Sequence, residues 1–322
     1  MHTAEYKIKS VMLGHAVGDA LGVPVEFTPR TVLDRTPVTD MMGYGTYNMP
    51  AGCWSDDTSM ALAALDSLKA GKVDWGQIMG NFAQWVHAGR YTPTGVLFDI
   101  GGICRDAIRR FEAYPAAPLQ CGPTDEYSNG NGSLMRIHPF SLYAYFCGTR
   151  DTALIHDASA LTHGHLRSRI ACGIYTFVLW ALLDSPTKAA VQTGLAQAYG
   201  HYKTYDENRT FLRLYRDIGQ IPCLAEDGTV SVDRSALRSD GYVVSTLEAA
   251  VWCLLTTDSF EACVLKAVNL GEDTDTTAAV AGGLAGALYG LSAIPADWRS
   301  QLKESTSIES LCAQAAAAWT KA

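Results

Sequence analysis

Apolar residues in this chain recur mostly every three or four positions, the spacing that places them on one face of an α-helix. The pattern is clearest in residues 8–16, 61–68, 170–181 and 244–254. Strict alternation of apolar and polar residues, which marks a half-buried strand, is rare, and Asn-Gly occurs only within residues 128–132, without an alternating run on both sides. The sequence therefore predicts an all-α protein.

Glycine- and proline-rich segments separate the predicted helices at residues 43–52, 115–132 and 221–241. None of them is a low-complexity linker, and no shift in composition marks a domain boundary. We therefore expect residues 1–322 to form a single compact domain of many helices. Near the C-terminus, glycines recur every four residues, which predicts a helix face that another backbone can approach closely; they are Gly282, Gly286 and Gly290.

The composition is that of an ordinary globular protein, with 48% hydrophobic and 18% charged residues among 322. A net charge of −8 argues against non-specific binding to nucleic acid or to an anionic membrane surface. The 9 cysteines include no C-x-x-C pair, which favours a reducing cytosol over a disulfide framework or a zinc knuckle. No apolar run approaches the ~20 residues of a membrane helix, and the most apolar segment, 277–291, is too short. We expect a cytoplasmic monomer.

Two acidic clusters directly precede strongly helical stretches, residues 55–58 (S-D-D-T) and 272–276 (E-D-T-D-T). Each can be read as helix capping, because acids and hydroxyls at a helix start satisfy its free amides and its macrodipole. However, Asp273 and Asp275 are two positions apart and would diverge within a helix, so they converge only where the chain is not yet helical. Carboxylate and hydroxyl oxygens suit Mg²⁺, Mn²⁺ or Ca²⁺. If the two helix starts face each other, a pair of metal ions is the expected neutraliser of four carboxylates.

A third acidic feature is the segment 14–26, G-H-A-V-G-D-A-L-G-V-P-V-E. Asp19 falls at the end of the first predicted helix, where the macrodipole disfavours an anion, so its position requires a compensating partner. Glu26 follows a proline in a turn and is a candidate mobile loop acid. For both residues a solvated surface acid is the simpler interpretation.

The loop 128–133, S-N-G-N-G-S, can present consecutive backbone amides to a phosphate and then lead into a helix N-terminus at Leu134-Met135-Arg136. A plain turn is the alternative, because the spacing matches neither a P-loop nor a dinucleotide-binding motif. In Thr162-His163-Gly164-His165, we expect His163 to form hydrogen bonds rather than to bind a metal. The sequence contains no nucleophile elbow and no adjacent cysteine and histidine, so covalent catalysis is not expected.

The chain resembles the ADP-ribosylglycohydrolase family, and in particular its bacterial dinitrogenase-reductase-activating type. The resemblance rests on seven short motifs that occur in this order from about residue 10 to about residue 290: G-D-A-L-G-V-P-V-E, S-D-D-T, F-D-I-G, N-G-N-G-S-L-M-R, T-H-G-H, G-Y-V-V-S-T-L and G-E-D-T-D-T-T. It implies a compact all-α fold with two divalent cations, Mg²⁺ or Mn²⁺, at the bottom of a cleft. It also implies hydrolysis of the N- or O-glycosidic bond between ADP-ribose and a protein side chain.

The same resemblance implies roles for individual residues. The metal ligands would be Ser55, Asp56, Asp57, Asp273, Asp275 and Thr276. The expected catalytic acids are Glu26, near the metals, and Asp99 of the F-D-I-G motif, near the scissile bond. The diphosphate loop would comprise Gly130, Asn131, Gly132 and Ser133, and further contacts to ADP-ribose would come from His163 and Tyr242. Gly102 departs from the bacterial type, which carries an Asn there, so the acceptor side chain is left open.

The mechanism that follows uses two metal ions about 3.5 to 4 Å apart, which bind ribose hydroxyls and hold a water for attack on the anomeric carbon. A carboxylate would stabilise the positive charge that builds on the sugar, and Glu26 or Asp99 would act as general acid or base. The expected substrate is a protein or a small conjugate that carries ADP-ribose, with ADP-ribosyl-arginine as the first choice. Two alternatives remain open, a metal-dependent nucleotide phosphohydrolase and a catalytically inactive ADP-ribose-binding module.

Overall fold

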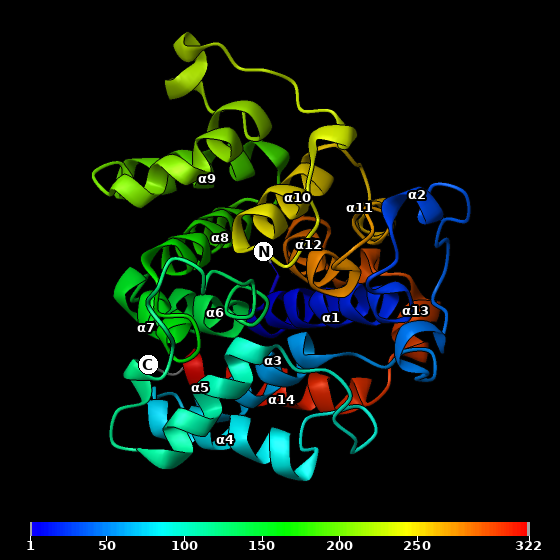
Figure 1. Cartoon of the computed structure of the whole chain (residues 1–322), viewed down its shortest axis with the longest axis vertical. Coiled ribbons are helices and arrows are strands. Elements are labelled where there is room, and N and C mark those ends of the chain that lie inside the picture. Colours follow the sequence, from blue (N-terminus) through cyan, green and yellow to red (C-terminus); the bar gives the residue numbers. More distant parts are fainter. Residues whose placement is uncertain (1, 321–322) are drawn as a thin grey trace.

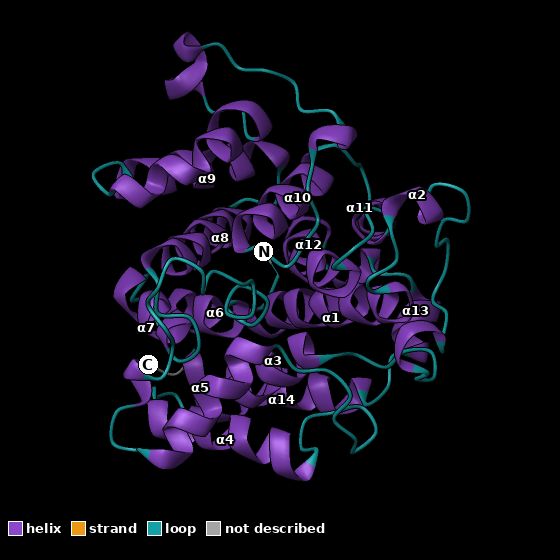
Figure 2. Ribbon diagram, viewed as in Figure 1, coloured by secondary structure: helices purple, strands orange, loops and turns teal. Residues whose placement is uncertain are grey.

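The computed structural model describes residues 2–320, which fold almost entirely into helices joined by loops (Figure 1, Figure 2). Within this range no β-strand forms, and the bridges Tyr44 to Met49 and Gly130 to Tyr242 are isolated. The predicted all-α class is therefore confirmed. The α-helices are α1 (Ala4–Gly22), α2 (Arg30–Leu33), α3 (Asp56–Leu68), α4 (Trp75–Ala88), α5 (Gly102–Ala113), α6 (His138–Phe146), α7 (Thr152–Ala160), α8 (Leu166–Asp184), α9 (Lys188–Tyr202), α10 (Val243–Leu255), α11 (Phe260–Val268), α12 (Thr274–Tyr289), α13 (Ala296–Gln301) and α14 (Ser305–Trp319).

Short 3₁₀ and π turns complete the helical structure. They are η1 (Val23–Val25), η2 (Gly45–Tyr47), η3 (Pro118–Gln120), η4 (Asp206–Phe211), η5 (Leu214–Ile218), η6 (Pro222–Asp227), η7 (Arg234–Ala236) and η8 (Leu291–Ala293). The four stretches with the clearest helical periodicity all lie inside α-helices, namely α1, α3, α8 and α10.

Helix α1 runs through the middle of the molecule (Figure 1). Every residue from Ser10 to Gly22 is buried, as expected for a helix that has neighbours on all sides. Helices α12, α11, α14, α3 and α6 all pack against it. The polar residues on α1 are therefore held inside the protein and need internal partners.

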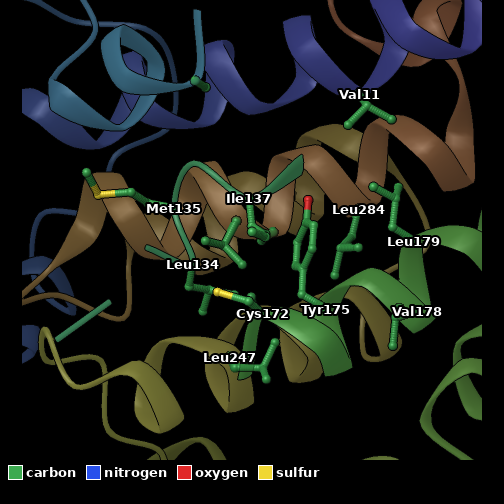
Figure 3. Packing of buried hydrophobic residues seen from close by; sticks show 14 of the residues in the cluster. Val11, Leu134, Met135, Ile137, Cys172, Tyr175, Val178, Leu179, Leu247 and Leu284 are labelled. Atoms are coloured by element: carbon green, nitrogen blue, oxygen red, sulfur yellow. The ribbon is translucent and has the colours of Figure 1, made fainter. Parts of the chain in front are cut away.

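Part of the apolar core lies around α8, α10 and α12, as Figure 3 shows. Tyr175 and Val178 of α8 belong to one buried cluster with Leu247 of α10 and Leu284 of α12. Burial of each such side chain contributes about 1.5–3 kcal/mol of transfer free energy. This packing holds the helices that carry the polar residues described below.

Helix α8 corrects one expectation from the sequence. This helix of 19 residues is long and apolar enough to cross a membrane, with a mean hydropathy of 1.3 in its most apolar stretch. No segment of this kind was expected from the sequence. In the structure 78% of this apolar stretch is buried inside the protein. Core packing therefore accounts for its apolar character.

Helices α1 and α12 run antiparallel with their backbones in direct contact. A Cβ atom on Gly14 would lie 2.5 Å from the carbonyl oxygen of Gly282, and one on Gly18 would lie 2.1 Å from that of Ala278. The predicted close approach of another backbone to this face of α12 is confirmed. We call this contact the glycine seam; its members are Gly14, Gly18, Gly22, Gly282 and Gly286.

Gly290 is not part of the seam. Helix α12 ends at Tyr289, and Gly290 follows it with a φ of +83°. This conformation favours glycine, so Gly290 ends the helix and does not extend its face. The periodicity of the three glycines therefore predicted two seam positions correctly and the third wrongly.

The seam determines where the first turn of α12 lies. A Cβ atom on Gly22, the last residue of α1, would lie 2.3 Å from the Cα of Asp275. The C-terminal end of α1 is therefore fixed against the acidic start of α12, and the candidate functional residues gather at this place.

We expect Gly18→Ala to destabilise the protein and to displace the first turn of α12. The new methyl group would overlap the carbonyl of Ala278, and backbone cannot move aside without separating the helices. Overpacking of this kind costs about 1–3 kcal/mol, which thermal unfolding would measure. Gly80→Ala in α4 is the matched control, because no heavy atom lies within 4 Å of its added Cβ. A loss in Gly18→Ala no larger than in Gly80→Ala would contradict the seam.

Candidate active site

A cavity of about 370 Å³ opens where the first turns of α3 and α12 meet. Its lining includes four carboxyl groups, those of Glu26, Asp56, Asp99 and Asp273. The loops 99–104 and 130–132 and the side chain of His163 form much of the remaining wall. Each of the seven sequence motifs contributes at least one lining residue, so segments far apart in the sequence form one site.

The starts of α3 and α12 converge at this cavity. Thr276, in the first turn of α12, donates a hydrogen bond from Oγ1 to Oδ2 of Asp57, in the first turn of α3, at 3.2 Å. Ser55, the N-cap of α3, donates to the same oxygen at 3.2 Å. The prediction that the two helix starts face each other is confirmed by these contacts.

Three buried carboxylate oxygens in this cluster have no hydrogen-bond partner: Asp57 Oδ1, Asp273 Oδ1 and Asp275 Oδ2. An unsatisfied buried acceptor costs about 1–3 kcal/mol. Helix capping does not account for them, since Asp273 is the N-cap of α12 and its side chain makes no capping hydrogen bond. Hard divalent cations prefer carboxylate and hydroxyl oxygens as ligands. The residues present therefore fit a divalent cation.

The cluster crowds several buried carboxyl groups together, which makes their ionised forms unfavourable. Burial raises the pKa of Asp57 well above its usual value, and the charge of Asp19 raises it further. Burial acts in the same way on the pKa of Asp275, with Glu26 as the next contributor. Carboxyl groups in such surroundings ionise readily only when a positive charge is close. The electrostatics of the cluster thus agree with its unpartnered oxygens.

Asp19, at the end of α1, caps the start of α3. Its carboxylate accepts hydrogen bonds from the backbone amides of Ser55 and Thr58 at 2.9 and 3.0 Å, and from their hydroxyls at 3.0 and 2.7 Å. The N-terminus of α3 is thus the compensating partner that the position of Asp19 requires. Asp19 is fully buried, so its interpretation as a solvated surface acid is wrong. Burial raises the pKa of Asp19 to about 6, while the hydrogen bonds from Thr58 and Ser55 act in the opposite direction.

Glu26 is also buried, with only 7% of its surface exposed, which again contradicts a surface acid. Tyr47 of η2 donates a hydrogen bond to its Oε2 at 2.6 Å. Burial first, and the charge of Asp99 second, raise the pKa of Glu26 to about 8. Both effects favour the protonated form of this carboxyl group as long as no cation is bound beside it.

The segment that follows Glu26 is anchored to the chain that leads into α12. The amide of Phe27 donates to the carbonyl of Glu272 at 2.7 Å, and the amide of Glu272 donates to the carbonyl of Thr28 at 2.9 Å. Arg30 adds three hydrogen bonds to backbone carbonyls, those of Leu270 at 2.7 Å, Arg234 at 2.8 Å and Leu237 at 2.9 Å. The candidate mobile acid thus lies beside an anchored segment.

Asp99 lies in the loop before α5. Oxygens of Glu26, Asp99 and Asp275 lie within 4.8 Å of one another, a spacing that could hold a metal ion. Burial raises the pKa of Asp99, and burial together with the charge of Asp99 raises that of Asp56. Asp56 also accepts a hydrogen bond from the amide of Gly101 at 3.2 Å. The two expected catalytic acids therefore belong to the same cluster as the expected metal ligands.

Asn131 connects the loop 130–132 to the start of α12. Its side-chain Nδ2 donates to Oδ2 of Asp273 at 2.8 Å and to Oγ1 of Thr246 at 2.9 Å. Its backbone amide donates to the carbonyl of Gly241 at 3.0 Å. The expected helix N-terminus directly after this loop is wrong, since residues 132–136 form turns and α6 begins at His138. Any phosphate would have to be bound by amides of the loop itself.

Two of the expected substrate contacts do not line the cavity. Ser133 is buried, accepts a hydrogen bond from the hydroxyl of Ser159 at 3.0 Å and lies 3.5 Å from Sγ of Cys172. Tyr242 is half-buried at the N-cap of α10 and interacts with Arg167. By contrast, its neighbour Gly241 and the expected residues Gly130, Asn131, Gly132 and His163 do line it.

His163 lies against the loop 130–132. A Cβ atom on Gly132 would be 2.9 Å from Cε1 of His163 and 2.8 Å from Sγ of Cys104, so this close approach requires glycine. Burial lowers the pKa of His163 to about 3, and the ring is neutral at physiological pH. The expectation that His163 forms a hydrogen bond is confirmed, since its Nδ1 lies 2.9 Å from Oγ1 of Thr162.

Several residues of the site were not identified from the sequence. Thr58 follows the S-D-D cluster in the first turn of a predicted helix, so its role in binding Asp19 could have been found from that position. Tyr47 lies in the glycine-rich segment 43–52 and Arg30 begins the short helix α2, and no local pattern marks either residue. Their contacts depend on how distant segments meet.

We expect Asp19→Asn to lower the melting temperature and to weaken the binding of divalent cations. An amide offers one acceptor oxygen where the carboxylate offers two, and its NH₂ would face donors of Ser55 or Thr58. Hydrogen bonds to charged groups contribute about 1.5–3 kcal/mol each. Thermal unfolding and a Mn²⁺ titration would measure the two effects.

Asp106→Asn on the exposed face of α5 is the matched control, because its ion pair with Arg109 is 3.8 Å long and a surface pair of this kind contributes about 0–1 kcal/mol. Equal melting temperatures for the two variants would disprove the capping role of Asp19.

Comparison with known proteins agrees with this geometry. The family described as ADP-ribosylglycohydrolase matches residues 1–322. ADP-ribosylarginine hydrolase Tri1 of Serratia proteamaculans (strain 568) is 33% identical over 309 residues, which cover 96% of this chain and 78% of that protein. ADP-ribosyl-(dinitrogen reductase) glycohydrolase of Rhodospirillum rubrum is 31% identical over 293 residues, 90% of this chain and 88% of that protein.

A solved structure described as an ADP-ribosylglycohydrolase-related protein complex has the same fold. It gives a TM-score of 0.78 at 30% sequence identity, and the match covers 100% of this chain and 99% of that chain. Together with the family match over residues 1–322, this likeness extends over the whole sequence. The chain therefore belongs to the ADP-ribosylglycohydrolase family, and it is an enzyme of that family.

Proposed function

We propose that this protein is a metal-dependent hydrolase that cleaves the bond between ADP-ribose and a modified arginine side chain and releases ADP-ribose. The observation that carries the proposal is the convergence of two acidic helix starts at a cavity that is also lined by a glycine loop and a neutral histidine. The acids offer oxygens to cations, and the loop offers amides to a diphosphate. The relative from Serratia proteamaculans is named for the hydrolysis of ADP-ribosylarginine, which supports arginine as the acceptor.

Two divalent cations, Mg²⁺ or Mn²⁺, would be held by the oxygens at the two helix starts. Bound there, they would polarise ribose hydroxyls and lower the pKa of a bound water, which supplies the nucleophile. The unpartnered oxygens of Asp57, Asp273 and Asp275 support this assignment. The full proposed ligand set is Ser55, Asp56, Asp57, Asp273, Asp275 and Thr276.

Glu26 and Asp99 would move the protons. Burial raises the pKa of Glu26 to about 8. Its carboxyl group accepts a hydrogen bond from the hydroxyl of Tyr47, which fixes its orientation. Two neighbouring acids in different surroundings can divide the roles of general acid and general base. Their oxygens, with that of Asp275, lie within 4.8 Å of one another. Carboxylates at this place would also stabilise positive charge on the sugar ring as the bond to the side chain breaks.

The diphosphate would be bound by the loop 130–132 and His163. The amide of Asn131 is engaged with the carbonyl of Gly241, so the amides of Gly130 and Gly132 are the candidates for phosphate oxygens. The side chain of Asn131 holds Asp273 and thereby links this part of the site to the metal ligands. Gly102, at the start of α5, lines the same cavity and leaves room for the acceptor side chain.

We expect Asp275→Asn to lower kcat/KM for an arginine-linked ADP-ribosyl peptide by about 100-fold or more, because loss of even an outer-shell partner of a metal typically costs 10- to 100-fold. Release of ADP-ribose with saturating Mn²⁺ is the measurement. Glu272→Gln is the matched control, since it removes an exposed negative charge three positions away and does not line the cavity. Full activity of Asp275→Asn after treatment with a chelator would refute the metal role.

The products and the linkage test the reaction itself. Incubation with arginine-linked and serine-linked peptides, with and without Mg²⁺ or Mn²⁺, should release ADP-ribose from the arginine linkage in the presence of metal. Inorganic phosphate or AMP as product would support a phosphohydrolase. Binding of ADP-ribose without turnover of either peptide would support an inactive module.

We also expect divalent cations to stabilise the protein more at pH ~8 than at pH ~5. The buried carboxyls have folded pKa values above their unfolded ones. In metal-free protein their contribution to stability is fully present below the unfolded values of about 4. It is lost as the pH rises towards the folded value, about 8 for Glu26. Cations compete with these protons, so their affinity rises over the same interval.

The measurement is the difference in melting temperature between metal-loaded and chelator-treated protein across this pH range. The difference should widen as the pH rises. A constant or shrinking difference would show that these carboxyls do not hold the cations.

A further inference from the structure

Arg136 carries a positive charge into the protein core. Its side chain is 0% exposed, and the guanidinium lies over the ring of Phe82 at 5.1 Å. Its Nη2 donates to the carbonyl of Ala158 at 3.1 Å and to Oγ1 of Thr162 at 2.7 Å, while Nε and Nη1 have no partner. Among the residues 2–224 and 228–320, whose side chains the structure describes, no carboxylate pairs with it. Arginine stays protonated in proteins, so a buried cation without a counter-ion lies here, an arrangement that costs stability.

Thr162 connects Arg136 to the ring of His163 through hydrogen bonds. Its Oγ1 accepts from Arg136 and lies 2.9 Å from Nδ1 of His163. The proton of the hydroxyl is then free to be donated to Nδ1. Cys104 is the other group near this hydroxyl, and neutral sulfur is a weak acceptor. The positive charge of Arg136 also disfavours a proton on the nearer ring nitrogen. Both effects leave Nδ1 as an acceptor and place the ring proton on Nε2.

Nε2 of His163 lies close to Gly130 and Gly132, which line the cavity. The ring lines the cavity although only 2% of the residue is exposed. A Cβ atom on Gly130 would be 3.4 Å from Nε2, and one on Gly132 would be 3.5 Å from it. No acceptor in the described part of the chain hydrogen-bonds to Nε2, so a nearly buried donor faces the loop that would bind the diphosphate. An anionic oxygen of a ligand is the acceptor that suits this place.

We propose that Arg136 and Thr162 are positioning residues that fix His163 in its neutral Nε2–H form, so that the ring donates a hydrogen bond to a phosphate oxygen of the substrate. The inference rests on the proposed function for the identity of the ligand. The hydrogen-bond relay from Arg136 through Thr162 to His163 is a property of the protein alone. The uncompensated charge of Arg136, which reaches His163 through Thr162, adds attraction for an anion bound by the ring.

The test compares wild-type protein with Thr162→Val, which has the same shape and lacks the hydroxyl. Thr162→Ser keeps the hydroxyl and is the matched control. NMR of protein labelled with ¹⁵N-histidine reports which ring nitrogen carries the proton, and His163→Gln identifies the signal. Calorimetric titration with free ADP-ribose measures affinity without any bond cleavage, and thermal unfolding shows that each variant is folded.

We expect wild type and Thr162→Ser to show a single Nε2–H form of His163. Thr162→Val should show a mixture of the two neutral forms and about tenfold weaker binding of ADP-ribose, the loss that corresponds to one hydrogen bond. A wild-type ring protonated at Nδ1 would overturn the proposal, even if Thr162→Val fails to fold. An unchanged Nε2–H form and affinity in Thr162→Val would overturn it as well.

The outcome also separates this inference from the proposed function. Wild-type protein that shows the Nε2–H form but does not bind ADP-ribose would contradict the proposed function and the proposed ligand, while the relay itself would stand. Protein that binds ADP-ribose with His163 in the Nδ1–H form would contradict the relay and leave the proposed function intact.

Discussion

Helices α1 and α12 touch along their backbones, and the site of this enzyme depends on that contact. Side chains usually keep packed helices 8–10 Å apart, whereas the glycine seam lets the carbonyl of Gly282 approach within 2.5 Å of the Cβ position of Gly14. Because the two helices are antiparallel, the end of one meets the start of the other. Asp19 near the end of α1 and Asp275 at the start of α12 are thus brought to the same place by backbone geometry alone.

The acids that meet at this place differ in their hydrogen bonding: Asp19 has partners, while Asp57 and Asp275 each lack one. Asp19 is satisfied by the amides and hydroxyls of Ser55 and Thr58, so its charge is compensated by a helix N-terminus. Asp57 and Asp275 each keep a buried oxygen without a partner. The fold therefore treats neighbouring carboxylates differently: one organises the site, and the others remain available to a ligand. The difference arises because the backbone amides of Ser55 and Thr58 at the start of α3 donate to the carboxylate of Asp19.

Local signals in the sequence predicted the convergence of the two acidic helix starts, while the other expected site residues came from the family resemblance. Acids at the starts of two helices, with Asp273 and Asp275 too close in sequence to share a helix face, indicated convergence, and the contact between Thr276 and Asp57 confirms it. The need of Asp19 for a partner was also visible from its place at a helix end. The identity of that partner was not visible, because it depends on how α1 and α3 pack.

The predictions that failed concern features that depend on tertiary packing. Asp19 and Glu26 looked like surface acids because no local pattern reports burial. The contact of Tyr47 with Glu26 spans a loop whose conformation the sequence does not specify. Gly290 shares the periodicity of the seam but ends its helix. Residues 134–136 looked like a helix start, and the structure has turns there. The apolar character of α8 reflects the burial of most of the helix inside the protein, which composition alone does not distinguish from a membrane span.

The glycine seam also makes the relative position of two acids independent of the side chains around them. The spacing of Asp19 and Asp275 is set by two backbones in van der Waals contact, so it has no side chain through which it could be adjusted. The segment 221–241, which contributes Gly241 to the cavity lining, is not part of this seam. Changes in the length or composition of this segment leave the contact between the two helix backbones in place, and with it the distance between Asp19 and Asp275. A protein built in this way can accept substitutions and insertions in such a segment without moving the acids at the two helix ends.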